Sequence, residues 1–353
     1  MKNIPIAVLL TTAMLSVFAH AADKENTNAL PQLGADSESV TVSGLSSGGA
    51  MAVQYGVAFS SEVSGVGVIA GIPYECVNVL SFDPTDPLAS LTNAGRAYHC
   101  MEKGADLDTL LSLTKRHEKQ GKIDSISNIA KQKVWLFSGT EDPTVKPVTM
   151  ETVHRYYQEV GPQKNINFVK NIPAGHAFVT DDVGSPCSET KSPYINDCDY
   201  DSAKEMLSWV VGPLKDSPPS QPGKLSLFDQ RPFIDSTLTS MDEQGYVFIP
   251  QNCSTQSGCK VHVAFHGCQQ NKDTLGDEYP TEVGINEWAD ANNIIVLYPQ
   301  AKTRLMMNPK GCWDWWGYTR YDYAYKSGLQ MNAVNKMVKH LLTKNPAQDT
   351  KTM

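Results

Sequence analysis

A pentapeptide with the pattern Gly-x-Ser-x-Gly lies at 44–48 and is the first feature of the sequence that could do chemistry. In this pattern the serine occupies a tight turn between a strand and a helix, and the flanking glycines allow that turn. A β-branched run, 39–43, precedes it, and a helical pattern, 50–59, follows it. Ser46 is therefore the candidate nucleophile of an acyl transfer. Ser47 falls at an x position, and the alternative is an ordinary turn rich in serine and glycine.

A serine hydroxyl is a weak nucleophile, so it needs a base, and the base needs an acid to hold it. Where the serine occupies such a turn, the acid and then the histidine follow it along the chain. Asp142 comes directly after the apolar run 133–139, and His176 follows the weaker run 166–169. Asp142 and His176 are the predicted acid and base.

Three other carboxylates compete with Asp142 for the role of the acid. Glu141 is its neighbour, and Asp181 and Asp182 lie close to His176 in the sequence. An acid so close to the histidine is unusual for this order of residues, so Asp142 is preferred. The alternative for both Asp142 and His176 is an ordinary loop residue.

The oxyanion formed during acyl transfer needs two preorganised donors. One is normally the amide after the nucleophile, here that of Ser47, and the other comes from a loop that is often marked His-Gly and follows an earlier strand. The His-Gly signature is present at 266–267, but it lies after His176 rather than before Ser46. Moving the segment after 212–223 to the front restores the usual order. The sequence therefore predicts a circular permutation.

The elements that must position these residues are apolar runs that alternate with helical patterns. Strands are expected at 39–43, 63–70, 133–139, 166–169, 245–250, 260–265 and 294–298, and helices at 50–59, 202–211 and 328–342. Such alternation is typical of an α/β fold with a mostly parallel central sheet and helices on both faces.

The stretch 212–223 is rich in proline and glycine and has no periodicity, so it is interpreted as a connector. With the permutation it joins the two permuted halves of one catalytic domain, 22–353, instead of linking two domains. The polar ends, 22–37 and 344–353, are expected to be loose.

Catalysis by a metal is the competing chemistry, and the histidine spacing argues against it. His262 and His266 are four residues apart in a strand-like run, which separates them by about 13 Å. The His-Glu-x-x-His motif is absent. No metal and no cofactor are expected.

An aromatic cluster lies at 311–318, and Trp315 is its candidate functional residue. The functional interpretation is an apolar wall beside the active site, and the alternative is packing next to a disulfide.

The N-terminal residues 1–21 have the layout of a secretory signal peptide, with Lys2, an apolar run and a small-x-small site at 19–21. The apolar run is short for a membrane anchor. We therefore expect an exported protein, in the medium or the periplasm, that does not bind a membrane. The net charge of −8 and the absence of a basic stripe argue against a nucleic-acid partner. A monomer is expected.

Eight cysteines in an exported chain indicate disulfides. Neighbouring couples along the chain suggest the pairs Cys76–Cys100, Cys187–Cys198 and Cys253–Cys259, which leaves Cys268 with Cys312. Other pairings stay open, because eight cysteines allow about 105 of them.

Five motifs in this order resemble the polyhydroxybutyrate depolymerases of the single-domain, circularly permuted type. They are Gly-Leu-Ser-Ser-Gly-Gly at 44–49, Gly-Thr-Glu-Asp at 139–142, Gly-His-Ala-Phe at 175–178, His-Gly-Cys at 266–268 and Cys-Trp-Asp-Trp at 312–315. The resemblance covers essentially the whole chain after residue 21, without the separate polymer-binding domain of many extracellular depolymerases.

The resemblance implies a permuted α/β-hydrolase fold and a secreted serine esterase that cleaves poly(3-hydroxybutyrate) to short 3-hydroxybutyrate esters through an acyl-enzyme. It maps the triad onto Ser46, Asp142 and His176, and the oxyanion amides onto Ser47 and Cys268. It also supports the disulfide pairing above. Two alternatives remain: a feruloyl or acetyl esterase acting on plant cell walls, and a secreted binding protein with a dead hydrolase fold.

Overall fold

The computed structural model describes residues 29–80, 92–216 and 222–344. The expected signal peptide, 1–21, and the middle of the expected connector, 217–221, lie outside these ranges. In the described residues, no helix has the length and apolar character needed to cross a membrane.

A central sheet of eight strands forms the core of the structure, and a small three-stranded sheet accompanies it. The strands of the large sheet are β1 Val40–Leu45, β2 Val63–Ile69, β3 Lys133–Phe137, β4 Ile166–Val169, β8 Lys224–Asp229, β9 Gln244–Ile249, β10 Lys260–Phe265 and β11 Ile294–Tyr298. Those of the small sheet are β5 Phe178–Thr180, β6 Ser185–Pro186 and β7 Ile195–Asp197.

The helices of the first half are α1 Ser47–Ala58, α2 Cys76–Val79, α3 Asn93–Lys103, α4 Leu107–Lys119, α5 Pro147–Val160 and α6 Ser202–Val210. Those of the second half are α7 Lys272–Leu275, α8 Glu278–Glu282, α9 Ile285–Ala291 and α10 Leu329–Leu342. Several begin at a polar cap: the side chains of Thr92, Asp106 and Asp201 each accept a hydrogen bond from an amide in the first turn of α3, α4 and α6.

The order of strands across the large sheet is β4-β3-β2-β1-β10-β11-β9-β8. The strands from β4 to β11 run parallel, and β9 and β8 add antiparallel pairs at one edge. When the second half of the chain is read first, this order becomes 1-2-4-3-5-6-7-8, which is the α/β-hydrolase order. The predicted circularly permuted α/β-hydrolase fold is therefore confirmed.

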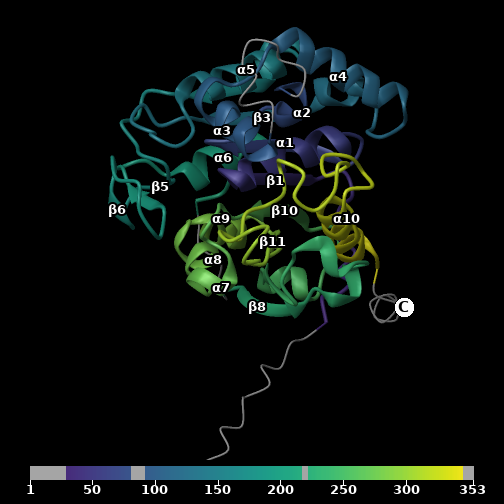
Figure 1. Cartoon of the computed structure of the whole chain (residues 1–353). Helices are drawn as coiled ribbons and strands as arrows, with labels where there is room; N and C mark the ends of the chain where they lie inside the picture. The colour runs from purple at the N-terminus through teal and green to yellow at the C-terminus, as the bar shows by residue number, and fades with distance from the viewer. Residues whose placement is uncertain (1–28, 81–91, 217–221, 345–353) are drawn as a thin grey trace, which may run out of the picture.

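The two halves of the chain meet in the middle of the sheet, where β1 pairs with β10 (Figure 1). Alternate residues of the strands point into two hydrophobic cores, one on each face. In β11, for example, Ile295 and Leu297 join the core beneath α1, α5 and α10, and Val296 joins the core with α6 and α9. Because the inner strands are buried on both faces, they appear in the sequence as continuous apolar runs.

Some elements were not predicted from the sequence. The edge strand β8 is partly exposed and therefore lacks a continuous apolar run. The helices α3, α4 and α5 were also missed. The expectation of a loose N-terminal segment is wrong for its described part: Leu30 and Leu33 are buried, and the amide of Leu33 donates to the carbonyl of Leu341 at the end of α10.

Candidate active site

Ser46 occupies the turn between β1 and α1. Its backbone has φ 58° and ψ −117°, a conformation that L-residues rarely adopt and that persists only where the surrounding structure imposes it. The amide of Ser46 donates to Ile69 on the neighbouring strand β2, and its carbonyl accepts from Ala50 within α1, both at 2.9 Å. The strand-turn-helix context predicted for Ser46 is thus present.

Glycines on either side of Ser46 make this turn sterically feasible. A Cβ atom at Gly44 would lie 2.3 Å from the backbone of Gly48, and a Cβ atom at Gly48 would lie 2.1 Å from the carbonyl oxygen of Phe265. Larger residues would therefore push α1 away from β1 and β10. Because Phe265 ends β10, the same close approach brings the Ser46 turn next to the loop that begins at His266.

His176 and Asp142 form a buried pair. Nδ1 of His176 lies 2.8 Å from Oδ2 of Asp142, and the two side chains are only 7% and 1% exposed. The other carboxylate oxygen accepts from the amides of Thr144 and Val145 at 2.8 and 2.9 Å. The carboxylate is an acceptor, so Nδ1 carries the proton that it donates. The remaining nitrogen, Nε2, is then free to act as a base.

The rival acids lie elsewhere. Glu141 is exposed, and its neighbour Asp142 is the residue that reaches His176. Asp181 and Asp182 line a separate small pocket, where their charges help raise the pKa of Glu287 after the larger effect of burial. Among these four carboxylates, Asp142 is the one whose side chain reaches His176.

A cavity of about 450 Å³ opens onto both Ser46 and His176. No hydrogen bond joins the Ser46 hydroxyl to any residue in the described part of the chain; catalytic hydrogen bonds often tighten only when substrate binds. The cavity walls are mainly apolar, with contributions from Leu45, Ala97, Met101 and Trp315.

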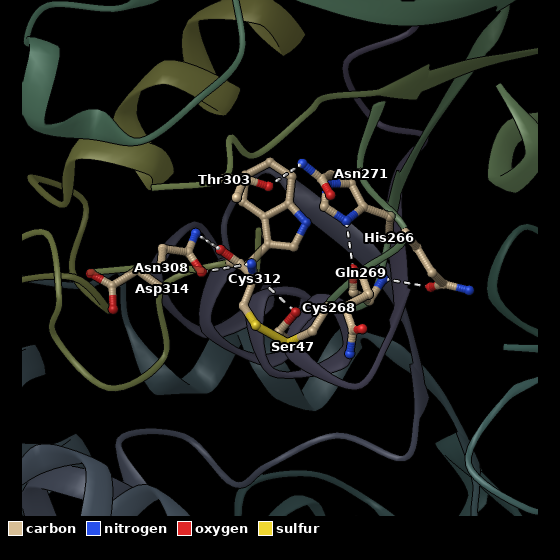
Figure 2. The surroundings of a disulfide bond; sticks show 12 residues. Ser47, His266, Cys268, Gln269, Asn271, Thr303, Asn308, Cys312 and Asp314 are labelled. Carbon is tan, nitrogen blue, oxygen red and sulfur yellow. Dashed lines mark hydrogen bonds between the residues drawn. A yellow bond between two sulfur atoms is a disulfide. The ribbon is translucent and has the colours of Figure 1, made fainter. Parts of the chain in front are cut away.

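Two backbone amides next to the nucleophile are available as donors. Ser47 is the first residue of α1, where amides have no partner within the helix. Cys268 follows His266-Gly267 and lines the cavity. Among the described residues, neither amide has an acceptor. Figure 2 shows Ser47 beside the disulfide that joins Cys268 to Cys312.

No family model matches the chain. The chain is 34% identical over 333 residues to a polyhydroxybutyrate depolymerase of Talaromyces funiculosus, and the match covers 89% of this chain and 93% of that enzyme. The chain belongs to the polyhydroxybutyrate depolymerase family.

A second member of this family is longer. The poly(3-hydroxybutyrate) depolymerase of Delftia acidovorans is 41% identical over 314 residues, and the match covers 88% of this chain but 60% of that enzyme. The chain therefore spans less than two thirds of that relative's length.

Solved structures of the family have the same fold. The crystal structure of the PHB depolymerase from Penicillium funiculosum has a TM-score of 0.80 at 33% identity and covers 89% of this chain and 99% of that one. A serine-to-alanine PHB depolymerase complexed with an R3HB trimer has a TM-score of 0.79 at 32% identity, with the same coverage.

The eight cysteines of this depolymerase-family chain form four disulfides, each between two cysteines that are consecutive in the sequence. The four disulfides are Cys76–Cys100, Cys187–Cys198, Cys253–Cys259 and Cys268–Cys312. They are the couples suggested above. Cys76–Cys100 fastens α3, which contributes part of the cavity wall.

Trp315 lines the cavity and is 7% exposed. The buried carboxylate of Asp314 holds the segment that follows Trp315, because it accepts hydrogen bonds from the amides of Gly317 and Thr319 at 2.7 and 2.8 Å. Burial raises the pKa of Asp314, and these hydrogen bonds partly offset the rise. Trp316, next in the aromatic run, also lines the cavity.

Sequence reasoning missed several residues of the cavity wall. Tyr98 and Met101 belong to α3, Tyr194 precedes β7, and Met307 follows β11. No motif marks these residues. Only the Cys100 position, inside α3, could have indicated that this segment is fastened to the core.

His262, in β10, and His266, the residue that follows β10, are both fully buried. His262 lies 2.8 Å from the hydroxyls of both Thr41 and Ser43, and burial lowers its pKa to about 3. Burial lowers the pKa of His266 to about 4. Across the described ranges, no group of three or more metal-binding side chains could hold an ion.

Proposed function

We propose that the chain is a serine esterase that hydrolyses poly(3-hydroxybutyrate) or its oligomers to short 3-hydroxybutyrate esters through an acyl-enzyme. The observation that carries the proposal is the buried Asp142–His176 pair, which opens onto the same cavity as Ser46. Membership of the depolymerase family supports the substrate, as does the family structure complexed with an R3HB trimer.

The reaction begins when His176 takes the proton of the Ser46 hydroxyl through Nε2. The oxygen attacks the ester carbonyl, and the amides of Ser47 and Cys268 hold the resulting oxyanion. The alcohol end of the polymer leaves with the proton from His176. A water molecule, activated by the same imidazole, then hydrolyses the acyl-enzyme. Asp142 keeps the imidazole in the required tautomer and stabilises its cationic form.

The composition of the cavity suits an aliphatic polyester. A poly(3-hydroxybutyrate) chain carries methyl groups and ester carbonyls but no charge along its length. The walls formed by Ala97, Met101 and Trp315 offer apolar contact, and Lys310 is the only lysine, arginine, aspartate or glutamate among the described lining residues. Burial of methyl groups against such walls supplies binding energy without the need for a charged partner.

The test is a product analysis on amorphous polymer with wild-type protein and the Ser46→Ala variant. The wild type releases 3-hydroxybutyrate and its short oligomers, and Ser46→Ala folds normally but releases none. Ser61→Ala, which changes an exposed serine in the turn between α1 and β2, is the matched control and keeps wild-type activity. Release of ferulate from a feruloyl ester, without release from the polymer, overturns the proposed substrate.

We also propose that the protein is exported, with 1–21 as its leader, and that it acts as a monomer with one catalytic domain, 22–353. The four disulfides support export, because such bonds persist in oxidising compartments. Pairing of β1 with β10 within one sheet supports a single domain in which 212–223 joins the permuted halves. The polyester is the partner, and no role for nucleic acid or membrane is proposed.

A further inference from the structure

The proposed oxyanion donor at Cys268 belongs to the same peptide unit as the carbonyl of Gly267. A trans peptide is planar, and its N–H and C=O groups point in opposite directions. Whatever holds the Gly267 carbonyl therefore also sets the direction of the Cys268 amide. Cys268 lines the cavity, and its amide has no acceptor among the described residues, which leaves it free to donate into the cavity. The carbonyl is then directed away from the cavity, into the protein.

The imidazole of His266 holds this carbonyl. Its Nδ1 lies 2.8 Å from the oxygen of Gly267, and its Nε2 lies 3.1 Å from the amide nitrogen of Ala301, beyond the end of β11. A backbone amide can only donate, so Nε2 is the acceptor and Nδ1 carries the proton. The Nδ1–H group therefore donates to the Gly267 carbonyl.

The surroundings of His266 keep this arrangement fixed. The side chain is fully buried, with the ring centroids of Trp313 and Tyr279 at 5.4 and 6.4 Å. Burial lowers the pKa of His266 to about 4, so the ring stays neutral near neutral pH and Nε2 remains an acceptor. Figure 2 shows His266 directly above the loop that carries Cys268.

A second contact immobilises the other side of Gly267. Its amide donates to Oε1 of Gln270 at 2.7 Å, and the Nε2 group of Gln270 donates to the carbonyl of Pro193 at 2.8 Å. The peptide groups before and after Gly267 are thus each held by a hydrogen bond. His266 acts on the peptide that bears the Cys268 amide, and Gln270 acts on the peptide before it.

We propose that His266 is a positioning residue of the oxyanion hole, which aims and polarises the Gly267–Cys268 peptide so that the Cys268 amide meets the developing oxyanion. The proposal rests on the proposed esterase function. Donation to the carbonyl strengthens the amide of the same peptide as a donor, because hydrogen bonds in a chain polarise one another. His266 itself does not touch the substrate.

The two nitrogens of His266 can be tested separately with two amide side chains. Asparagine places an NH₂ group near the position of Nδ1, so His266→Asn keeps a donor to the Gly267 carbonyl and loses the acceptor for Ala301. Glutamine reaches the position of Nε2, so His266→Gln keeps the acceptor and loses the donor. A merely structural role predicts similar effects for both variants.

The expected result is a selective loss of kcat on a soluble 3-hydroxybutyrate ester. His266→Gln lowers kcat by about 10- to 100-fold with KM within about threefold, since a misdirected oxyanion donor acts mainly in the transition state. His266→Asn keeps kcat within about threefold of wild type. Equal losses of kcat in the two variants overturn the proposal.

His262, which lies in β10 just before this loop, supplies a matched control. It too is fully buried and held by two hydrogen bonds, but these go to the hydroxyls of Thr41 and Ser43. His262→Gln therefore perturbs the core to a similar extent without changing the peptide at Cys268. Its kcat at pH 7.5 stays within about twofold of wild type, and a loss as large as that of His266→Gln overturns the proposal.

Two spectroscopic measurements complete the test. Infrared spectroscopy of a ¹³C-labelled acyl-enzyme reports the hydrogen bonds to its carbonyl, and the stretching frequency rises in His266→Gln but not in His266→Asn. ¹⁵N NMR of the wild-type protein shows Nδ1 of His266 protonated and Nε2 unprotonated. Because this measurement needs no variant, it does not depend on whether a variant folds. An unchanged frequency in His266→Gln, or the opposite tautomer, overturns the proposal. If the wild-type protein forms no acyl-enzyme at Ser46, the proposed esterase function is itself wrong. That outcome is recognised before any His266 variant is compared.

Discussion

Cys268 and Cys312 are joined by a disulfide that fastens the loop after β10 to the segment carrying Trp315. The two segments are 44 residues apart in sequence, and both line the cavity that contains Ser46. The bond therefore connects the loop of the proposed oxyanion donor to the apolar wall. The disulfide thus links the loop that follows β10 to the segment that follows β11.

Replacement of both Cys268 and Cys312 by serine is expected to reduce stability and activity together. Loss of a disulfide closing a loop of this length lowers the free energy of unfolding by about 3 to 4 kcal/mol. The freed loop also misplaces the Cys268 amide, so kcat falls about tenfold or more. Urea denaturation and steady-state kinetics on a soluble ester measure the two effects.

The disulfide Cys253–Cys259 is the control for this prediction. Its cysteines are six positions apart, and Cys259 directly precedes β10, at the opposite end of the strand from His266. Its double serine variant is less stable than wild type but retains kcat. If both double variants lose kcat equally, the cavity-side disulfide has no specific effect on the site.

Substitution of Asp142 by asparagine is expected to abolish most of the activity while the fold persists. The amide keeps an oxygen for the amides of Thr144 and Val145, but it no longer offers a carboxylate to Nδ1 of His176. The imidazole then loses its tautomer and the stabilisation of its cationic form, which costs about 10⁴-fold in kcat in triads of this kind. Asp181→Asn, at the rival acid, leaves kcat unchanged. Comparable losses in the two variants would reassign the acid.

Protonation of His262 is expected to make stability depend on pH. Burial lowers the pKa of this ring to about 3 in the folded state, against 6.5 for an exposed histidine. As the pH falls below 6.5, the unfolded chain binds the proton first, so the free energy of unfolding decreases by up to about 1.4 kcal/mol per pH unit. The decrease continues until the pH reaches the folded-state value near 3.

The measurement is urea denaturation at several values between pH 7 and pH 5, for wild type and His262→Gln. The variant lacks the titrating group, so its stability changes less steeply over this range. His266, whose pKa is lowered to about 4, contributes a slope of the same sign in both proteins. Identical slopes would show that His262 is not the group responsible.

The triad candidates could be predicted from the sequence because a local motif and the order of residues along the chain both point to them. Ser46 sits in a motif whose glycines are required by a turn, and Asp142 follows a buried strand that is visible as an apolar run. The permuted fold followed from the position of the His-Gly signature after His176. These signals are local, or depend only on order along the chain.

The rest of the site depends on contacts between residues that are distant in the sequence, and no local sequence pattern predicts such contacts. Tyr98 and Tyr194 reach the cavity from α3 and from the segment before β7, and each has an ordinary local sequence. The edge strand β8 escaped prediction because all but one of its residues are only partly buried or exposed, so it lacks a continuous apolar run. The role inferred for His266 required two distances, to Gly267 and to Ala301, since the sequence shows only that a histidine precedes a glycine.

Trp315 is expected to contribute binding energy rather than chemistry. Its ring is 7% exposed, packs at 5.4 Å from that of Trp316 and borders the cavity, but it has no group that could transfer a proton to Ser46 or His176. Trp315→Ala removes apolar contact along the ester chain and raises KM for a 3-hydroxybutyrate trimer about tenfold, equivalent to about 1.4 kcal/mol.

Steady-state kinetics with dimer and trimer esters separate this effect from a general loss of structure. Because the removed contact acts on the bound chain in both the ground and transition states, kcat changes by less than about threefold. Trp209→Phe is the matched control: this half-buried tryptophan donates to the carbonyl of Asn165, near β4, and is not among the residues lining the cavity. The control keeps wild-type KM. A Trp315→Ala variant with unchanged KM and strongly reduced kcat contradicts a binding role and indicates that the ring instead positions the loops around Ser46.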